Sequence, residues 1–148
     1  MKTREVRMQK VFLLAEAEEN KQCRAMGQSQ QSLNDEMQRL EELKSYRLSY
    51  GAESAQRQFN SLQWKEYQNF LKRLDKAVEV QTQVVADSRL KRDAHRLRWV
   101  TKRRHAESLE RVVQRFANQA MEEEERSLQK ATDELAVNSN TNHKIFRS

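Results

Sequence analysis

Proline is absent from the 148 residues, and glycine occurs only at Gly27 and Gly51. Tight turns are built largely from these residue types, so their scarcity argues against a globular fold with many turns. The hydrophobic share is only 36%, against 34% for charged residues. A chain of this composition buries its apolar surface best where helices pair along a narrow seam. Disorder is the alternative for such a polar chain, and the regular spacing of its apolar residues disfavours it.

Cysteine and long apolar runs are scarce as well. Cys23 is the only cysteine, so an internal disulfide is excluded and nothing implies an oxidising compartment. No apolar run approaches the ~18 residues of a membrane-spanning helix, and the N-terminal region lacks the pattern of a signal peptide. We therefore expect a cytoplasmic protein.

Catalytic and metal-binding patterns are missing too. The sequence has no Gly-rich phosphate-binding loop, no G-x-S-x-G and no C-x-x-C. His95 and His105 lie ten residues apart on one expected helix, and one thiol with three dispersed imidazoles does not supply four convergent zinc ligands. The acidic run 122–125 is interpreted as a solvated helical face. We therefore expect no enzymatic activity, no metal, no cofactor and no small-molecule substrate.

What the sequence does contain is an apolar spacing of alternating four and three residues. Two helices are expected, over about 4–50 and about 62–136. The first carries Leu33, Met37 and Leu40, continued less regularly upstream by Met8, Val11, Ala15 and Met26. The second carries Tyr67, Leu71, Leu74, Val78, Gln81 and Val85, and then Trp99, Lys102, Ala106, Leu109, Val113, Phe116 and Ala120. This spacing predicts left-handed coiled-coil packing.

The spacing falters in the middle of the second helix. The count lands there on the polar residues Ser88, Arg92 and His95, while a competing apolar stripe, shifted in phase, is formed by Leu90, Ala94 and Leu97. Two explanations fit this pattern: a local stutter in the supercoil, or a stretch without a closely packed partner.

One segment, 51–61, separates the two helices, and its sequence GAESAQRQFNS combines Gly, Ser and Asn without a clear period. A single turn between two long helices predicts an all-α antiparallel coiled-coil hairpin, with the second helix longer. We expect one domain over residues 1–136, followed by a polar, flexible tail over 137–148.

Aromatic residues gather near the expected turn. In an antiparallel hairpin centred near residue 58, the opposite pairs are Tyr46 with Phe70, Tyr50 with Tyr67, and Leu43 with Leu74. Because Tyr67 and Leu74 already follow the seam, Phe70 is expected on its flank, partly exposed. These rings either cap the seam or form a partner-binding patch, since exposed aromatic clusters are favoured at interfaces.

Positive charge is concentrated in one block of this basic chain, whose net charge is +6. Residues 89–104 carry eight Lys or Arg side chains against the single Asp93. The block is a solvated coiled-coil flank, a contact for an acidic protein ring or groove, or a sequence-independent nucleic-acid contact. No nucleic-acid module accompanies it, so nucleic acid is not the expected partner. The candidate ring contacts are Arg89, Arg92, Arg96, Lys102, Arg103 and Arg104.

Two motifs flank the expected turn. The first, L-x-x-Y-x-x-x-Y, is formed by Leu43, Tyr46 and Tyr50. The second, W-x-x-Y-Q-x-F-[IL]-x-x-L-x-x-A-[IV]-x-x-Q, is formed by Trp64, Tyr67, Gln68, Phe70, Leu71, Leu74, Ala77, Val78 and Gln81. With these motifs, their spacing and its length, the chain resembles the FliJ family of flagellar export proteins over most of its residues.

The resemblance implies a fold like the stalk (gamma) subunit of rotary ATPases and a role in flagellar type III export, at the cytoplasmic face of the inner membrane. The end with both termini would enter the hexameric export ATPase ring and promote its assembly and activity. The hairpin would reach the cytoplasmic domain of the membrane export-gate protein, and the family also escorts export chaperones. The gate-binding positions of the family fall on Leu43, Tyr46, Tyr50, Phe70, Leu74 and Ala77, and less firmly on Arg39 and Gln81, where the family residue is not always kept.

Two other classes of protein would share the helical rod. One is a stalk protein of an injectisome, and the other is a general coiled-coil adaptor with a different partner. The second motif favours the flagellar family.

Overall fold

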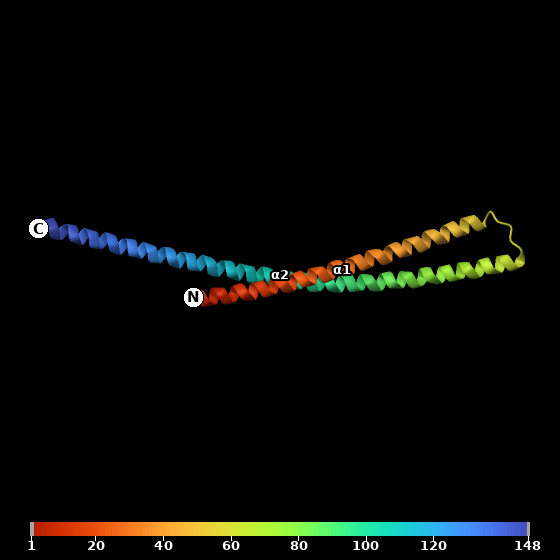
Figure 1. The fold of residues 1–148 in the computed structure, drawn as a ribbon, viewed down its shortest axis with the longest axis horizontal. Helices are drawn as coiled ribbons and strands as arrows, with labels where there is room; N and C mark the ends of the chain where they lie inside the picture. Colours follow the sequence, from red (N-terminus) through yellow and green to blue (C-terminus); the bar gives the residue numbers. More distant parts are fainter. Residues whose placement is uncertain (1, 148) are drawn as a thin grey trace. The chain divides into compact units, whose positions relative to one another are not determined.

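The computed structural model describes residues 2–147, with side chains for residues 3–142. These residues form two α-helices, α1 (Lys2–Ser54) and α2 (Ser61–Arg147), joined by a loop over 55–60 (Figure 1). No strand occurs among the described residues. The expected all-α pair of helices, with the longer helix second, is confirmed.

Both helices run further than expected. α1 continues through Gly51 to Ser54, so the loop is shorter than the predicted turn 51–61. α2 continues past Ala136 to Arg147, so the segment predicted as a polar tail, 137–148, is helical over its described residues. No proline or glycine occurs in that segment, and nothing in its backbone chemistry stops the helix.

The chain divides into two compact units. The hairpin unit, Glu19–Lys102, contains the loop and the adjoining part of each helix. The terminal unit combines Met1–Glu18 with Arg103–Ser148. The boundaries fall within the helices, where no loop marks them in the sequence.

In the hairpin unit, buried and half-buried side chains form an unbroken series spaced by alternating three and four residues. On α1 the series is Glu19, Gln22, Met26, Ser29, Leu33, Glu36, Leu40, Leu43, Arg47, Tyr50 and Ser54. On α2 it is Tyr67, Leu71, Leu74, Val78, Gln81, Val85, Ser88, Arg92, His95 and Trp99. Leu33 is the most deeply buried side chain of this unit, with 2% of its surface exposed. The period is that of coiled-coil packing, as the sequence predicts.

Three residues predicted to lie on the seam do not. Met37 is 44% exposed, and the neighbouring Glu36 takes the seam position. Glu36 fits there because its carboxylate and its backbone carbonyl accept hydrogen bonds from Gln81 Nε2, at 2.6 and 2.9 Å. In the terminal unit Val11 is exposed and Phe12 is half-buried, while Lys102, at the edge of the hairpin unit, is exposed.

The polar stretch in the middle of α2 belongs to the seam. Its polar residues are half-buried, whereas the competing apolar stripe of Leu90, Ala94 and Leu97 is exposed. Arg92 donates to Gln30 Oε1 at 2.9 Å, and Trp99 Nε1 donates to Glu19 Oε1 at 2.9 Å. Both predicted explanations are therefore wrong, because the count continues without a stutter and α1 supplies partner groups.

In the terminal unit the same count continues on both helices. The half-buried or buried residues at this spacing are Glu5, Met8, Phe12 and Ala15 on α1, and Ala106, Leu109, Val113, Phe116 and Ala120 on α2. The Arg4 guanidinium carbon lies 4.2 Å from the centroid of the Phe116 ring, which is a cation–π contact. From Met121 to Asn142 every side chain of α2 is exposed.

Candidate partner-binding site at the hairpin loop

The start of α2 is specified by a local capping pattern. Asn60 Oδ1 accepts a hydrogen bond from the Gln63 backbone N–H at 2.8 Å, and Gln63 Oε1 accepts one from the Asn60 N–H at 3.2 Å. This reciprocal pair is a capping box, with Asn60 as the N-cap. Phe59, just before the cap, and Trp64, in the first turn, have ring centroids 6.2 Å apart, as in a hydrophobic staple. The loop therefore brings the Phe59 ring against α2.

The end of α1 is tied to α2 by a hydroxyl pair. Two backbone hydrogen bonds, from Gln56 to Glu53 and from Arg57 to Ser54, tighten the chain as it leaves the helix. The Ser54 hydroxyl also bonds the Gly51 carbonyl at 2.7 Å and the Tyr67 hydroxyl. Tyr67 is only 8% exposed, so its hydroxyl needs such a partner.

Six aromatic residues form one cluster beside the loop. The aromatic cluster consists of Tyr46, Tyr50, Phe59, Trp64, Tyr67 and Phe70. The Tyr67 ring stacks on both Tyr50 and Phe59, each at a centroid distance of 5.2 Å. Phe70 meets Tyr50 at 4.6 Å and Tyr46 edge-on at 6.3 Å. The predicted pairs Tyr46–Phe70 and Tyr50–Tyr67 are therefore in contact, which confirms the antiparallel register.

The cluster contains both buried and exposed rings. Tyr67 is buried, and Tyr50 and Phe70 are half-buried, as expected for Phe70 on the flank of the seam. Tyr46 is 52% exposed and Trp64 is 49% exposed. The sequence left two interpretations open, a cap on the seam and a partner-binding patch. Tyr67 has the burial expected of a cap, and Tyr46 has the exposure expected of a patch.

The other predicted gate-binding positions continue from this cluster along both helices. Leu74 is buried, whereas Leu43 and Ala77 are half-buried. The less firm positions, Arg39 and Gln81, are joined by Glu36, which accepts a hydrogen bond from Arg39 Nη1 at 2.9 Å in addition to those from Gln81. All eight predicted positions therefore lie in the hairpin unit, on α1 and α2, with Arg39 and Gln81 the furthest from the loop along their helices.

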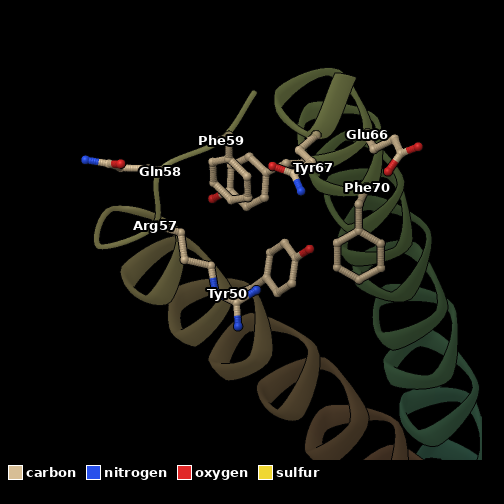
Figure 2. A pocket seen from close by; sticks show the side chains of 8 residues that line it. Tyr50, Arg57, Gln58, Phe59, Glu66, Tyr67 and Phe70 are labelled. Atoms are coloured by element: carbon tan, nitrogen blue, oxygen red, sulfur yellow. The ribbon is translucent and has the colours of Figure 1, made fainter. Parts of the chain in front are cut away.

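A pocket of about 510 Å³ opens among the rings and the loop (Figure 2). Its lining residues are Tyr50, Arg57, Gln58, Phe59, Gln63, Glu66, Tyr67 and Phe70. In Figure 2 Arg57 extends beside Tyr50, and the Glu66 carboxylate points away from the rings. The pocket thus combines four aromatic side chains with two glutamines, one cation and one carboxylate.

The basic side chains of residues 89–104 lie in different environments. Arg92 is half-buried in the seam, where it also bonds Asp93 at 2.8 Å, and Arg103 of the terminal unit pairs with Glu107 at 3.1 Å. The remaining candidates, Arg89, Arg96, Lys102 and Arg104, are exposed. Exposure suits a contact with another protein for these four residues, whereas Arg92 is already bonded to both helices.

Sequence reasoning missed two residues of the site. The predicted turn over 51–61 includes Phe59 without a role, and the second motif includes Trp64 without a role. The signal for both is F-N-x-x-Q-W over residues 59–64, which joins a capping box to a hydrophobic staple. Recognising that pattern would have placed both rings at the start of the second helix.

Neither helix, over its described residues, contains a stretch long and apolar enough to cross a membrane. Among the side chains described, no group of three or more His, Cys, Asp or Glu residues could hold a metal ion.

The fold and the site define a class of helical hairpins whose distinctive surface is an aromatic cluster beside the connecting loop. The family model described as the flagellar FliJ protein matches residues 3–144, nearly the whole chain. The chain therefore belongs to the FliJ family and is a component of the flagellar protein export apparatus. No curated protein and no solved structure matches it. This family is a non-catalytic part of the apparatus, and the absence of catalysis by this chain stays a prediction.

Proposed function

We propose that the chain links the hexameric export ATPase to the cytoplasmic domain of the membrane export-gate protein, as a stiff, non-catalytic coupling element. The aromatic cluster supports the gate contact. Its exposed member, Tyr46, packs edge-on against the half-buried Phe70, so a partner would meet a rigid aromatic surface. Rings of this kind supply most of the binding energy at many interfaces.

The roles of the gate-binding positions follow from their burial. Tyr46, Phe70 and Ala77 keep exposed surface that a partner could cover, whereas Leu74 and Tyr67 are buried and support them from the seam. Contacts with neighbouring rings hold Tyr46 and Phe70 before binding, so little side-chain entropy is lost on association. The salt bridge of Arg47 to Asp75, 2.8 Å long, joins the two helices one residue along the chain from Tyr46.

Two parts of the protein are candidates for the ATPase contact. One is the end that carries both termini, by analogy with the family, and the other is the set of exposed basic side chains Arg89, Arg96, Lys102 and Arg104. A rod within a ring biases the conformations of the ring only if its contacts differ among them. The regular seam within each unit would provide the stiffness of that unit. Escort of export chaperones and a location at the cytoplasmic face of the inner membrane belong to the same proposal, by analogy with the family.

The test of the gate contact is a double variant, Tyr46→Ala with Phe70→Ala, titrated with the purified cytoplasmic domain of the cognate gate protein. We expect Kd to rise at least ~10-fold with unchanged far-UV circular dichroism, because two rings of the surface are lost. Leu48→Ala is the matched control, since Leu48 is a 75% exposed apolar residue of α1 outside the cluster. Equal affinities of the double variant and the control would refute the gate contact.

The ATPase contact is tested separately by adding the chain to the purified export ATPase. We expect faster ATP turnover and more hexamer, because a ligand that favours the assembled ring shifts the equilibrium toward it. Charge reversal at Arg89, Arg96 and Lys102 should reduce both effects and leave gate binding intact. Unchanged turnover with the native chain would rule out this half of the proposal.

A further inference from the structure

We propose that the pocket beside the loop receives one large apolar side chain of the gate domain, with a carboxylate of that domain paired to Arg57. This inference rests on the proposed gate contact and extends it around the loop. It adds Arg57, Gln58 and Phe59, which lie outside the predicted gate-binding positions. The partner segment is thereby specified as acidic and apolar.

The pocket has the size and the walls for an apolar side chain. Its volume of about 510 Å³ lies within the ~300–1,000 Å³ typical of ligand-binding pockets. Four of its lining residues are aromatic, and Phe59, Tyr67 and Tyr50 form a continuous stack of rings. An apolar side chain placed against this stack would be removed from water on contact.

The walls are fixed before any partner arrives. Tyr67 is held by the Ser54 hydroxyl, and Phe59 is held against Trp64 at the start of α2. The capping box of Asn60 and Gln63 fixes the loop that carries Phe59. A pocket formed in advance keeps the entropic cost of binding low, so it suits a specific anchor residue.

The charge at the rim selects a carboxylate. Arg57 is exposed and makes no salt bridge among the described residues. Glu66, the other charged lining residue, directs its carboxylate away from the rings (Figure 2). Nearby on α2, the Arg73 guanidinium lies 6.0 Å from the Phe70 ring centroid and adds a second positive charge. A partner carboxylate beside the pocket would thus meet attraction at Arg57.

The charge arm of the test compares Arg57→Glu with Lys65→Glu, using the cytoplasmic domain of the gate protein as the probe. Lys65 is an exposed cation of the same region that does not line the pocket, so it controls for net charge. We expect Arg57→Glu to raise Kd about fivefold or more, and Lys65→Glu to change it less than about twofold. The affinity of Arg57→Ala should also depend less on salt than that of the native chain.

The apolar arm removes one wall of the pocket. Phe59 lines the pocket and stacks on Tyr67, so Phe59→Ala removes one aromatic wall, whereas Gln58→Ser changes a neighbouring side chain that points away from the rings (Figure 2). We expect Phe59→Ala to weaken gate binding about tenfold, and Gln58→Ser to bind like the native chain. Circular dichroism of both variants checks that the helices are unchanged.

The outcomes separate this inference from the gate contact itself. If Tyr46→Ala with Phe70→Ala abolishes binding while Arg57→Glu and Phe59→Ala bind normally, the pocket proposal is overturned and the gate contact stands. If the native chain does not bind the gate domain, both proposals fail together. Weak binding by Phe59→Ala with normal binding by Arg57→Glu would overturn the carboxylate pairing.

Discussion

Two stretches of the seam in the hairpin unit differ in chemistry although they share one period. Near the loop, the seam is lined by aliphatic and aromatic residues such as Leu40, Leu74 and Tyr67. Further from the loop, its residues include Arg92, which bonds Gln30, and Trp99, which bonds Glu19. Apolar burial in the first stretch stabilises the pair of helices, whereas polar groups in the second fit only when their partners on the opposite helix are in register. The part of the seam near the loop therefore stabilises the pair of helices, and the polar part fixes the register of one helix against the other.

The largest effect is expected where apolar burial is most complete. Leu33→Ala should lower the free energy of unfolding by about 3 kcal/mol, because Leu33 is 2% exposed and its removal leaves a cavity. Urea unfolding followed by circular dichroism measures the change. Met37→Ala is the control, and its effect should stay below about 0.5 kcal/mol because Met37 lies off the seam. Similar losses for the two variants would mean that the seam runs through Met37 after all.

A smaller effect of opposite sign is expected in the polar stretch. His95 Nδ1 is buried and has no hydrogen-bond partner among the described residues, so His95→Leu should raise the free energy of unfolding by about 1 kcal/mol. His105→Leu, on the exposed surface of the same helix, should leave it nearly unchanged. Destabilisation by His95→Leu would show that the imidazole contributes a favourable contact, and that the contrast between the two stretches is overstated.

The smallest effect is expected on the outer face of the polar stretch. Leu90 and Leu97 are each 69% exposed, so Leu90→Ser with Leu97→Ser should change the free energy of unfolding by less than about 0.5 kcal/mol. The melting temperature and the sedimentation coefficient of the double variant check this expectation. A large loss would restore the stripe of Leu90, Ala94 and Leu97 as a packing surface.

The helical pair, its direction and its register could be predicted from the sequence, because they depend on the spacing of large residues and on the single loop. The errors share one physical origin. The spacing of apolar residues predicts Met37 on the seam. In the structure Glu36 takes this position, because Gln81 of the opposite helix donates hydrogen bonds to it. The interruption of the apolar spacing at Arg92 has the same cause, because the hydrogen bond from Arg92 to Gln30 of the opposite helix cannot be inferred from that spacing. A polar residue can lie on the seam when the opposite helix supplies a hydrogen-bond partner. The spacing of residues along one helix does not reveal that partner.

The candidate site could be predicted in part. The aromatic pairs follow from the hairpin register alone, and they are in contact. Phe59 was missed because loop composition conceals the local rule that orders it, the staple of Phe59 and Trp64 around the Asn60 cap. The pocket could not be predicted at all, because its volume depends on how far the loop and two helices stand apart, which no spacing rule states.

The exposed length of α2 beyond Ala120 has a consequence for every melting curve of this protein. Its side chains from Met121 to Asn142 are exposed. That part of the helix is therefore stabilised by backbone hydrogen bonds and by side-chain hydrogen bonds within the helix, such as the one that Gln129 Nε2 donates to Asp133 Oδ1 at 3.2 Å. Ellipticity should therefore decline gradually from that end before the paired region melts, and amide protons there should exchange with deuterium first. In a Trp64→Phe variant, the fluorescence of Trp99, which lies on the seam, will report the later, cooperative transition, and the two probes will not coincide.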